Sequence, residues 1–183
     1  MVAIDELLHE HRAVETMLEV LDRLCGKLAE GGKKELNDLK SILEFLEVFV
    51  DKCHHAKEEK ELFPALRESG RRKWEGEIEE LLADHEKGRA LVHELKASLG
   101  SVPSSMNAAH AATTAKAREY IALLNEHIEN EEKLFQAADK LLSQSRQQEL
   151  KTRFDKIEAE RIGPGRHEQF HRLIDSLKAE YLR

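Results

Sequence analysis

The chain has 183 residues, of which 36% are charged and only 5% aromatic, with a net charge of −7. This composition favours long solvated helices over a β-sandwich, and the length suits one domain with a sizeable core. The acidic balance argues against a nucleic-acid partner, because phosphate binding needs concentrated Lys and Arg.

The apolar segments and the cysteine count indicate the compartment in which the protein is expected. The start of the chain shows no apolar signal segment, and no apolar run approaches the ~18 residues of a membrane span. The two cysteines, Cys25 and Cys53, are too few for a disulfide framework and suit a reducing compartment. We therefore expect a cytoplasmic protein with no membrane contact. A homodimer is left open.

Apolar residues recur at helical spacing between clusters of Gly and Pro. This pattern predicts helices over residues 3–29, 35–69, 72–99 and 104–140, with breaks at Gly31-Gly32, Ser69-Gly70 and residues 100–105. Pro64 should kink the second helix or end its regular part. The polar stretch SQSRQQ predicts a turn or a weak helix start. Two more helices follow, one ending near Ile162 and one starting near Arg166.

Links this short favour antiparallel neighbours. The expected fold is therefore all-α, an antiparallel up-down-up-down four-helix bundle over residues 1–142. Residues 143–183 would form two extra C-terminal helical segments packed on that bundle.

Four His and two Glu residues form a duplicated pattern. A lone His in the first helix precedes a His-x-x-x-Glu pair in the second, and the third and fourth helices repeat this order. The residues are His11, His54 with Glu58, His85, and His127 with Glu131. Both pairs also continue alike, as HHAKEEKELFPA and HIENEEKLFQAA. A His and a Glu four residues apart lie on one helical face.

At ~100° per residue, all six residues lie on the apolar sides of their helices. The second helix contains a competing pair, His55 with Glu59. His54 and Glu58 share a side with Leu43 and Val50, whereas His55 and Glu59 turn away from it by about 100° or more. The helical phase therefore favours His54 and Glu58.

Convergence of these groups predicts a buried two-metal centre. A single inward His is more often a hydrogen-bonded core residue, but a buried carboxylate costs several kcal/mol unless it is paired or coordinated. Glu58 and Glu131 have no cationic partner on their own stripes, although Arg89 could supply one. Imidazole with carboxylate suits Fe, Mn or Zn. Two bridging carboxylates would leave two His for each ion and at least one open position, which favours binding of small diatomic ligands.

The chain resembles the hemerythrin-like, or HHE cation-binding, domain family. The matching segments are EHR (Glu10–Arg12), HHAKEEKELFP (His54–Pro64), DHEKGR (Asp84–Arg89) and HIENEEKLF (His127–Phe135). The resemblance implies an antiparallel bundle around two non-haem, carboxylate-bridged iron ions, with Zn or Mn as substitutes. It implies His11, His54, Glu58, His85, His127 and Glu131 as ligands, and binding of O₂ or NO, sensing, or repair of iron centres as functions.

The chain departs from the oxygen-carrying members of that family at two points. Those members place a second His one turn after the ligand of the third helix, where this chain has Arg89. Their last ligand pair is His-x-x-x-x-Asp, where this chain has His127-x-x-x-Glu131. One nitrogen fewer implies a more open ion on the third helix. A water or, against its helical phase, His55 would fill the vacancy.

Other residues invite weaker hypotheses. His167-Glu-Gln-Phe-His171 fits the H-E-x-x-H pattern of zinc proteases, but Phe170 and Ile174 describe a packing face and no third ligand follows. His167 could also reach the metal site. Cys53 is expected to pack in the core or to act as a redox thiol. Tyr120 is expected in the core or beside a ligand carboxylate, and Gly88 would leave space for a small ligand.

Three functions stay open at this point. The first is a protein that binds or senses O₂ or NO at a di-iron site. The second is a di-iron redox enzyme that reduces peroxide or NO or repairs iron–sulfur clusters. The third is a structural metal site, which an open coordination position disfavours.

Overall fold

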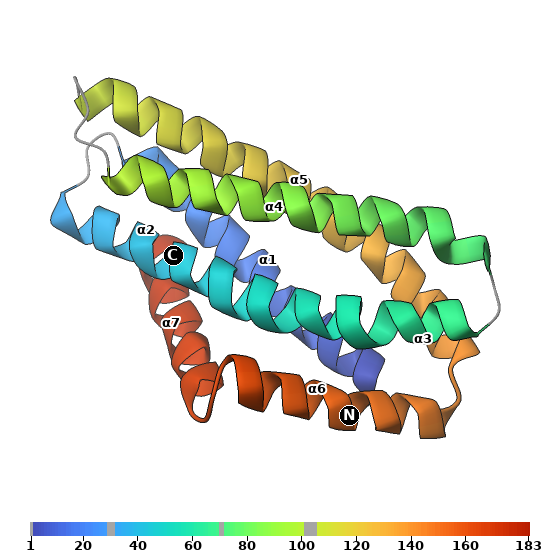
Figure 1. Ribbon diagram of the computed structural model, residues 1–183. Coiled ribbons are helices and arrows are strands. Elements are labelled where there is room, and N and C mark those ends of the chain that lie inside the picture. Colours follow the sequence, from blue (N-terminus) through green and yellow to red (C-terminus); the bar gives the residue numbers. More distant parts are fainter. Residues whose placement is uncertain (1, 29–31, 70–71, 101–105) are drawn as a thin grey trace.

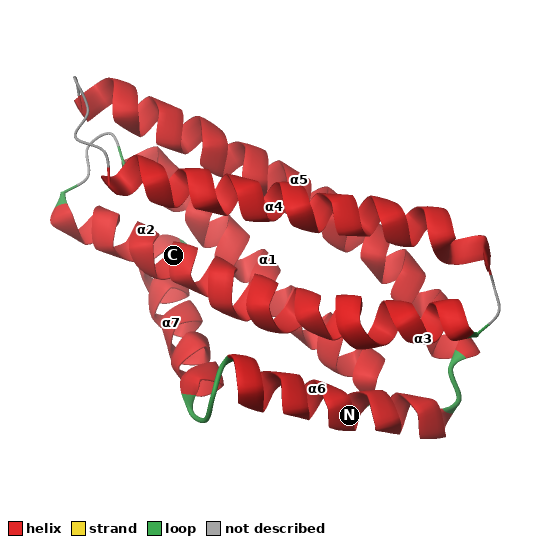
Figure 2. Cartoon of the chain, in the orientation of Figure 1, coloured by secondary structure: helices red, strands yellow, loops and turns green. Residues whose placement is uncertain are grey.

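The computed structural model describes residues 2–28, 32–69, 72–100 and 106–183, and no strand occurs among them (Figure 2). The all-α prediction is confirmed. The predicted breaks at Gly31-Gly32, Ser69-Gly70 and residues 100–105 each include residues outside the described ranges, as do the predicted end of the first helix and start of the fourth. The helices are α1 (Ala3–Lys27), α2 (Lys33–Phe45), α3 (Phe63–Glu68), α4 (Glu75–Gly100), α5 (Met106–Leu141), α6 (Gln144–Arg161) and α7 (Arg166–Tyr181).

Four long rods lie side by side in Figure 1: α1, the continuous rod that runs from α2 to α3, α4 and α5. Helix α5 packs against both α1 and α4, and α2 contacts α1 and α4. A short 3₁₀ turn, Arg72–Trp74, precedes α4. The rods bring parts of the chain that are far apart in sequence to one central axis.

The rod between α2 and α3 is not a regular α-helix. It contains two π-helical segments, η1 (Leu46–His55) and η2 (Glu58–Leu62). In a π-helix each N–H bonds to the carbonyl five residues back, so a turn holds more residues than the 3.6 of an α-helix. Pro64 follows in the first turn of α3, where a missing N–H is tolerated. Regular α-helix therefore stops at Phe45, well before Pro64, and resumes in α3, which contains Pro64.

The apolar core forms two clusters with a polar layer between them. One cluster includes Val14, Val50 and Leu124, and the other includes Leu7, Leu62 and Leu134. On α1 the polar layer falls between Leu7 and Val14, and on each of the other rods it likewise lies between a residue of one cluster and a residue of the other. The two clusters thus enclose the predicted site from both ends.

Helices α6 and α7 follow the four rods and pack on α1. Ser143 caps α6, since its Oγ accepts a hydrogen bond from the backbone N–H of Arg146 at 3.2 Å. Phe170 and Tyr181 of α7 join the core cluster of α1 and α2, and the Tyr181 hydroxyl donates to Asp38 at 2.6 Å. The division into two units near residue 142 stays a prediction. No helix within the described ranges is long and apolar enough to cross a membrane.

Candidate metal centre

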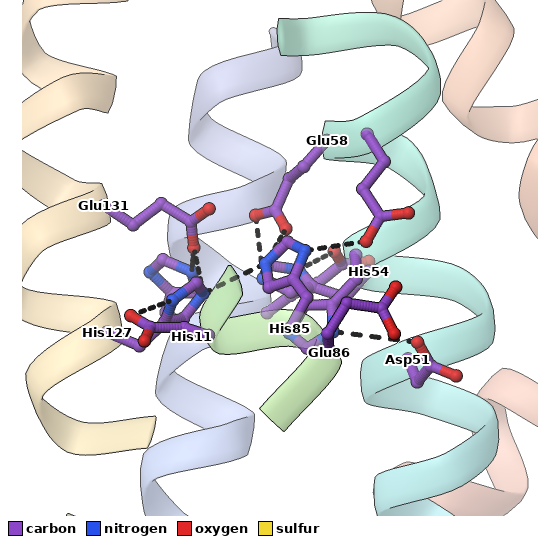
Figure 3. A network of polar contacts seen from close by, with 12 residues as sticks. His11, Asp51, His54, Glu58, His85, Glu86, His127 and Glu131 are labelled. Atoms are coloured by element: carbon purple, nitrogen blue, oxygen red, sulfur yellow. Dashed lines mark hydrogen bonds and ion pairs between the residues drawn. The ribbon is translucent and has the colours of Figure 1, made fainter. Parts of the chain in front are cut away.

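All six predicted site residues are buried in the polar layer, each with at most 2% of its surface exposed. They come from all four rods, and Figure 3 shows their side chains converging between the helices. The residues are His11 on α1, His54 in η1, Glu58 in η2, His85 on α4, and His127 and Glu131 on α5. The structure therefore brings all six together, and their role as metal ligands stays a prediction.

The side chains form two groups of potential ligand atoms. His11 and His54 gather with Glu58 and Glu131, and His55, His85 and His127 form the second group. Within each group the ligand atoms lie within 4.8 Å of one another. The ring centroids of His11 and His54 are 4.8 Å apart, as are those of His85 and His127. Each group is compact enough to surround one ion.

Glu58 and Glu131 lie between the two groups. Oε1 of Glu58 is 3.1 Å from Nε2 of His54, and its Oε2 is 3.6 Å from Nε2 of His85. Oε2 of Glu131 is 3.2 Å from Nε2 of both His11 and His127. Each carboxylate therefore contacts one imidazole of either group, which is the arrangement that a bridging ligand requires.

No hydrogen bond satisfies these carboxylates within the described part of the chain. All four oxygens of Glu58 and Glu131 are buried without a hydrogen-bond partner, and so is Nε2 of His11. Leaving a buried carboxylate unsatisfied is costly. Imidazole nitrogens and carboxylate oxygens directed at common points fit Fe, Mn or Zn ions. The donor set and its unsatisfied atoms thus fit a pair of cations.

The outward nitrogens of the imidazoles face a second ring of carboxylates. Nδ1 of His54 is 2.9 Å from Glu10, and Nδ1 of His85 is 2.8 Å from Glu59. More distant carboxylates face the other two rings, Glu132 at 3.4 Å from His11 and Asp84 at 3.5 Å from His127. For His54 and His85, an Nδ1–H held in this way leaves Nε2 as the ligand atom and fixes the ring orientation. Nδ1 of His11 and of His127 has no hydrogen-bond partner within the described residues.

His55 corrects the sequence analysis. Its helical phase predicted a side chain turned away from the centre, but the structure buries it against His85 with ring centroids 3.8 Å apart. The prediction was wrong because it assumed a regular α-helix, whereas His55 ends a ten-residue π-helical segment. His54 faces α1 and its neighbour His55 faces α4. The second group therefore holds three imidazoles, not two.

Glu59 lies outside both groups, as its helical phase predicted, and Arg89 lies differently from the expectation. Glu59 accepts hydrogen bonds from both His85 and the Arg89 guanidinium on the outer side of the centre. Arg89 also donates to Asp51 and Glu86, and it pairs with neither Glu58 nor Glu131. Arg89 thus lies on the outer side of the centre, and His55 occupies the position that was predicted to be vacant.

The ionisation of the metal-free site follows from burial and these contacts. Burial alone would lower the pKa of His54, but the carboxylates of Glu58 and Glu10 raise it to about 10. Burial would also lower the pKa of His127, and Glu131 raises it to about 10. His55 differs, since burial and the charge of His85 hold its pKa well below the ordinary value. His55 is therefore neutral and ready to act as a ligand at pH 7.

A cavity of about 280 Å³ reaches the three-His group from the side of α4. His55 and Arg89 line it together with Gly88 and Tyr120. Gly88 faces the Tyr120 ring, at a distance where an added Cβ would make ordinary contact. Tyr120 is buried and bonds to no carboxylate of the site within the described ranges, so it is a wall of this cavity. The expected space beside Gly88 is present.

The remaining candidates lie outside the two groups. Cys53 is 1% exposed, and burial raises the pKa of its thiol to about 12, which disfavours the reactive thiolate. Its Sγ lies within 4.8 Å of ligand atoms of Glu10 and Glu158. His167 bonds to Glu158 through Nδ1 at 2.8 Å and joins neither group. The hypothesis that His167 reaches the buried site is therefore wrong.

Fold and site together define the class: an all-helical protein with a buried His and Glu site able to hold cations. The chain belongs to the hemerythrin HHE cation-binding domain family, whose model matches residues 2–138. The resemblance expected from the sequence is thereby confirmed. Comparisons with curated proteins and with solved structures gave no match. Helices α6 and α7 lie beyond the matched residues.

Proposed function

We propose that the protein holds two iron ions in the arrangement of an antiparallel four-helix bundle and binds a small diatomic molecule there. His55, His85 and His127 would hold one ion, and His11 and His54 the other, with Glu58 and Glu131 shared between them. When bound, such a pair supplies an exchangeable position at which O₂ or NO can be taken up. The observation that carries the proposal is the pair of unsatisfied carboxylates between two imidazole groups.

The ligand count makes the two ions unequal. Three imidazoles and two shared carboxylates leave one position of six at the first ion, whereas two imidazoles and the same carboxylates leave two at the other. The more open ion is therefore the one next to His11 and His54. The sequence pattern predicted the opposite, with the more open ion on the third helix, because Arg89 stands there in place of a His. In this proposal His55 supplies the nitrogen that Arg89 does not.

The surrounding residues keep this centre dry and hold its ligands in place. The two apolar clusters enclose it from both ends, and the outer carboxylates fix the imidazoles. Lys57 is fully buried and neutralises Glu10, the partner of His54, through a contact of 2.5 Å between its Nζ and Oε1. The protein thus provides five imidazoles and two carboxylates at this site, with a cavity beside His55.

One observation favours the alternative of a di-iron redox enzyme. The cavity of about 280 Å³ beside His55 is larger than a diatomic molecule needs. Small-molecule sites in proteins begin at about this size. A peroxide or another small substrate could therefore approach the three-His group through this cavity.

Reconstitution separates these possibilities. The protein would be loaded anaerobically with iron(II), its iron per chain measured, and its optical spectrum followed after separate additions of O₂, NO and peroxide. Two ions per chain and reversible spectral changes with O₂ or NO support the binding function. Repeated consumption of peroxide or NO supports the enzyme, and no spectral response with two ions bound supports a structural site. One ion or none would overturn the two-ion assignment.

A further inference from the structure

The cavity beside His55 has an apolar wall. Leu46 of η1, Gly88 and Val92 of α4, and the ring of Tyr120 on α5 form this wall. Leu46, Val92 and Tyr120 are each at most 7% exposed and belong to the same apolar core cluster. An apolar cavity of about 150 Å³ already binds benzene. With about 280 Å³, this cavity is therefore large enough for a small organic molecule.

The charged groups of the lining are paired with one another. Arg89 pairs with Asp51 at 2.6 Å, and Lys96 pairs with Glu47. These two cations and two carboxylates are the Lys, Arg, Asp and Glu residues of the lining, so their formal charges sum to zero. A local field of one sign is what concentrates an ion of the other sign. Since the lining has no such surplus, it favours a neutral ligand.

One polar group of the lining lacks a partner. Tyr120 is 2% exposed, and its hydroxyl makes no hydrogen bond within the described ranges. This hydroxyl is not fully sealed off, in contrast to the oxygens of Glu58 and Glu131. Burial and the nearby carboxylate of Asp51, which also lines the cavity, raise the pKa of Tyr120, so the hydroxyl keeps its proton and can donate it. A ligand oxygen in the cavity would supply the missing acceptor.

We propose that this cavity binds a neutral organic molecule with an apolar group and one accepting oxygen, which Tyr120 holds by a hydrogen bond. Among peroxides this selects an alkyl hydroperoxide over hydrogen peroxide, because only the former has an apolar group for the wall to bury. Because His55 lines the same cavity, the bound molecule lies next to the three-His group. The peroxide class rests on the proposed di-iron centre, whereas binding to the cavity does not.

Binding to the metal-free protein tests the cavity without iron. The probes are cumyl alcohol and tert-butylbenzene, which have the same shape and differ by a hydroxyl in place of a methyl group. Both should bind saturably when the amide NMR signals of Gly88 and Val92 are followed. In Tyr120→Phe the affinity for the alcohol should fall about 3- to 10-fold, the usual effect of one lost hydrogen bond. The affinity for tert-butylbenzene should not change.

Filling the cavity gives a second test. Gly88→Leu should weaken the binding of both probes at least about tenfold, because the new side chain and the ligand compete for one volume. Gly76→Leu is the matched control, since Gly76 lies on the same helix and an added Cβ there meets no atom within 4 Å. Gly88→Ala should give a smaller loss in the same direction without disturbing the fold, because its Cβ would lie 3.6 Å from the Tyr120 ring.

Three results would overturn the proposal. They are the absence of saturable binding to the wild type, unchanged binding in both Gly88 variants, and binding that Gly76→Leu weakens as much as Gly88→Leu does. Loss of both probes to the same extent in Tyr120→Phe, or no loss of the alcohol, would overturn the hydrogen bond from Tyr120.

The iron-loaded protein tests the peroxide class. Cumene hydroperoxide and hydrogen peroxide are added separately to the iron(II) form, and the rate of the optical change is measured. Cumyl alcohol should compete with cumene hydroperoxide, and Gly88→Leu should slow the reaction with cumene hydroperoxide far more than that with hydrogen peroxide. Equal slowing of both would overturn the selection of an alkyl hydroperoxide. No response to either peroxide, with binding of the alcohol intact, would overturn the redox function alone.

Discussion

The imidazole rings of His55 and His85 lie nearly parallel, with centroids 3.8 Å apart and an interplanar angle of 12°. This contact joins η1 to α4 at the three-His group. It makes His55 the fifth imidazole of the centre, although its neighbour His54 already belongs to the other group.

Replacement of His55 by Ala should therefore weaken the binding of one metal ion. Its group would keep His85 and His127, the same number of imidazoles as the group of His11 and His54, so both ions should still bind, but the ion beside His85 should bind less tightly. Competition with a chelator after iron(II) reconstitution should remove this ion from the variant more readily than from the wild type. His93→Ala, on the same helix as His85 but exposed, should leave both affinities unchanged. Equal affinities in His55→Ala and the wild type would show that His55 is not a ligand.

Replacement of Glu58 by Ala should affect both ions, because its two oxygens face His54 and His85 separately. We expect less than one iron per chain after reconstitution. Since metal binding contributes to folding, the variant should also lose the rise in melting temperature that iron gives the wild type. Glu61→Ala, which removes a carboxylate from the same segment that pairs only with Arg153, is the control. Retention of one firmly bound ion would show that Glu58 is not shared.

As the pH rises, the stability of the metal-free protein should fall while its affinity for metal increases. In the metal-free protein the pKa values of His54 and His127 rise to about 10 from an ordinary value of 6.5. Their stabilising effect is complete below pH 6.5 and is lost as the pH rises towards 10, so the free energy of unfolding should fall over this range. Metal affinity should rise over the same range, because protons compete for the same nitrogens. Denaturant unfolding and zinc titration at several pH values measure the two trends. If the free energy of unfolding and the metal affinity changed in the same direction with pH, these two imidazoles would not be protonated in the metal-free protein.

The carboxylates outside the ligands should matter for affinity. Glu59→Ala removes the acceptor of His85 Nδ1, and loss of such a partner typically lowers metal affinity about 10- to 100-fold. Glu86→Ala removes another carboxylate that pairs with Arg89 but touches no imidazole, so it should change the affinity less than about twofold. Competition with a chelator measures both. Equal losses would mean that Arg89, not His85, transmits the effect.

Lys57 should contribute strongly to stability. Its ammonium is fully buried and pairs with Glu6 and Glu10 at 2.6 and 2.5 Å. Lys57→Met would remove the buried cation that Glu6 and Glu10 share and leave His54 as the remaining partner of Glu10, and it should cost about 3 kcal/mol of unfolding free energy. Lys52→Met breaks the exposed pair with Glu47 and should cost less than about 1 kcal/mol. Urea unfolding of the metal-free proteins compares the two variants. A loss of stability as small as that of Lys52→Met would show that the buried ion pairs of Lys57 contribute little to stability.

Much of this architecture was predictable from local rules. Apolar spacing together with Gly and Pro placed every long helix, and the duplicated His and Glu pattern identified six residues that the structure buries together. The polar SQSRQQ stretch predicted the break before α6, where Ser143 caps the helix. These predictions succeeded because helical phase, capping and burial depend on residues close in sequence.

The failure at His55 comes from helix geometry. A calculation at 100° per residue assumes a regular α-helix and does not allow for the π-helical turns of Leu46–His55, a segment that packs against α1 and α4. Pro64 is a local signal of irregularity in this rod, but it lies in the first turn of the regular helix α3, and the π-helical segments precede it.

The last two residues of η1 have a geometric consequence for the centre. His54 and His55 are consecutive residues, yet each belongs to a different group. A single peptide unit, whose bond lengths and planarity are fixed, therefore links the two halves of the site. In the proposed two-ion centre, this link would limit how far apart the two ions can lie. Exchange of iron for zinc or manganese in that centre should thus alter its chemistry far more than its dimensions.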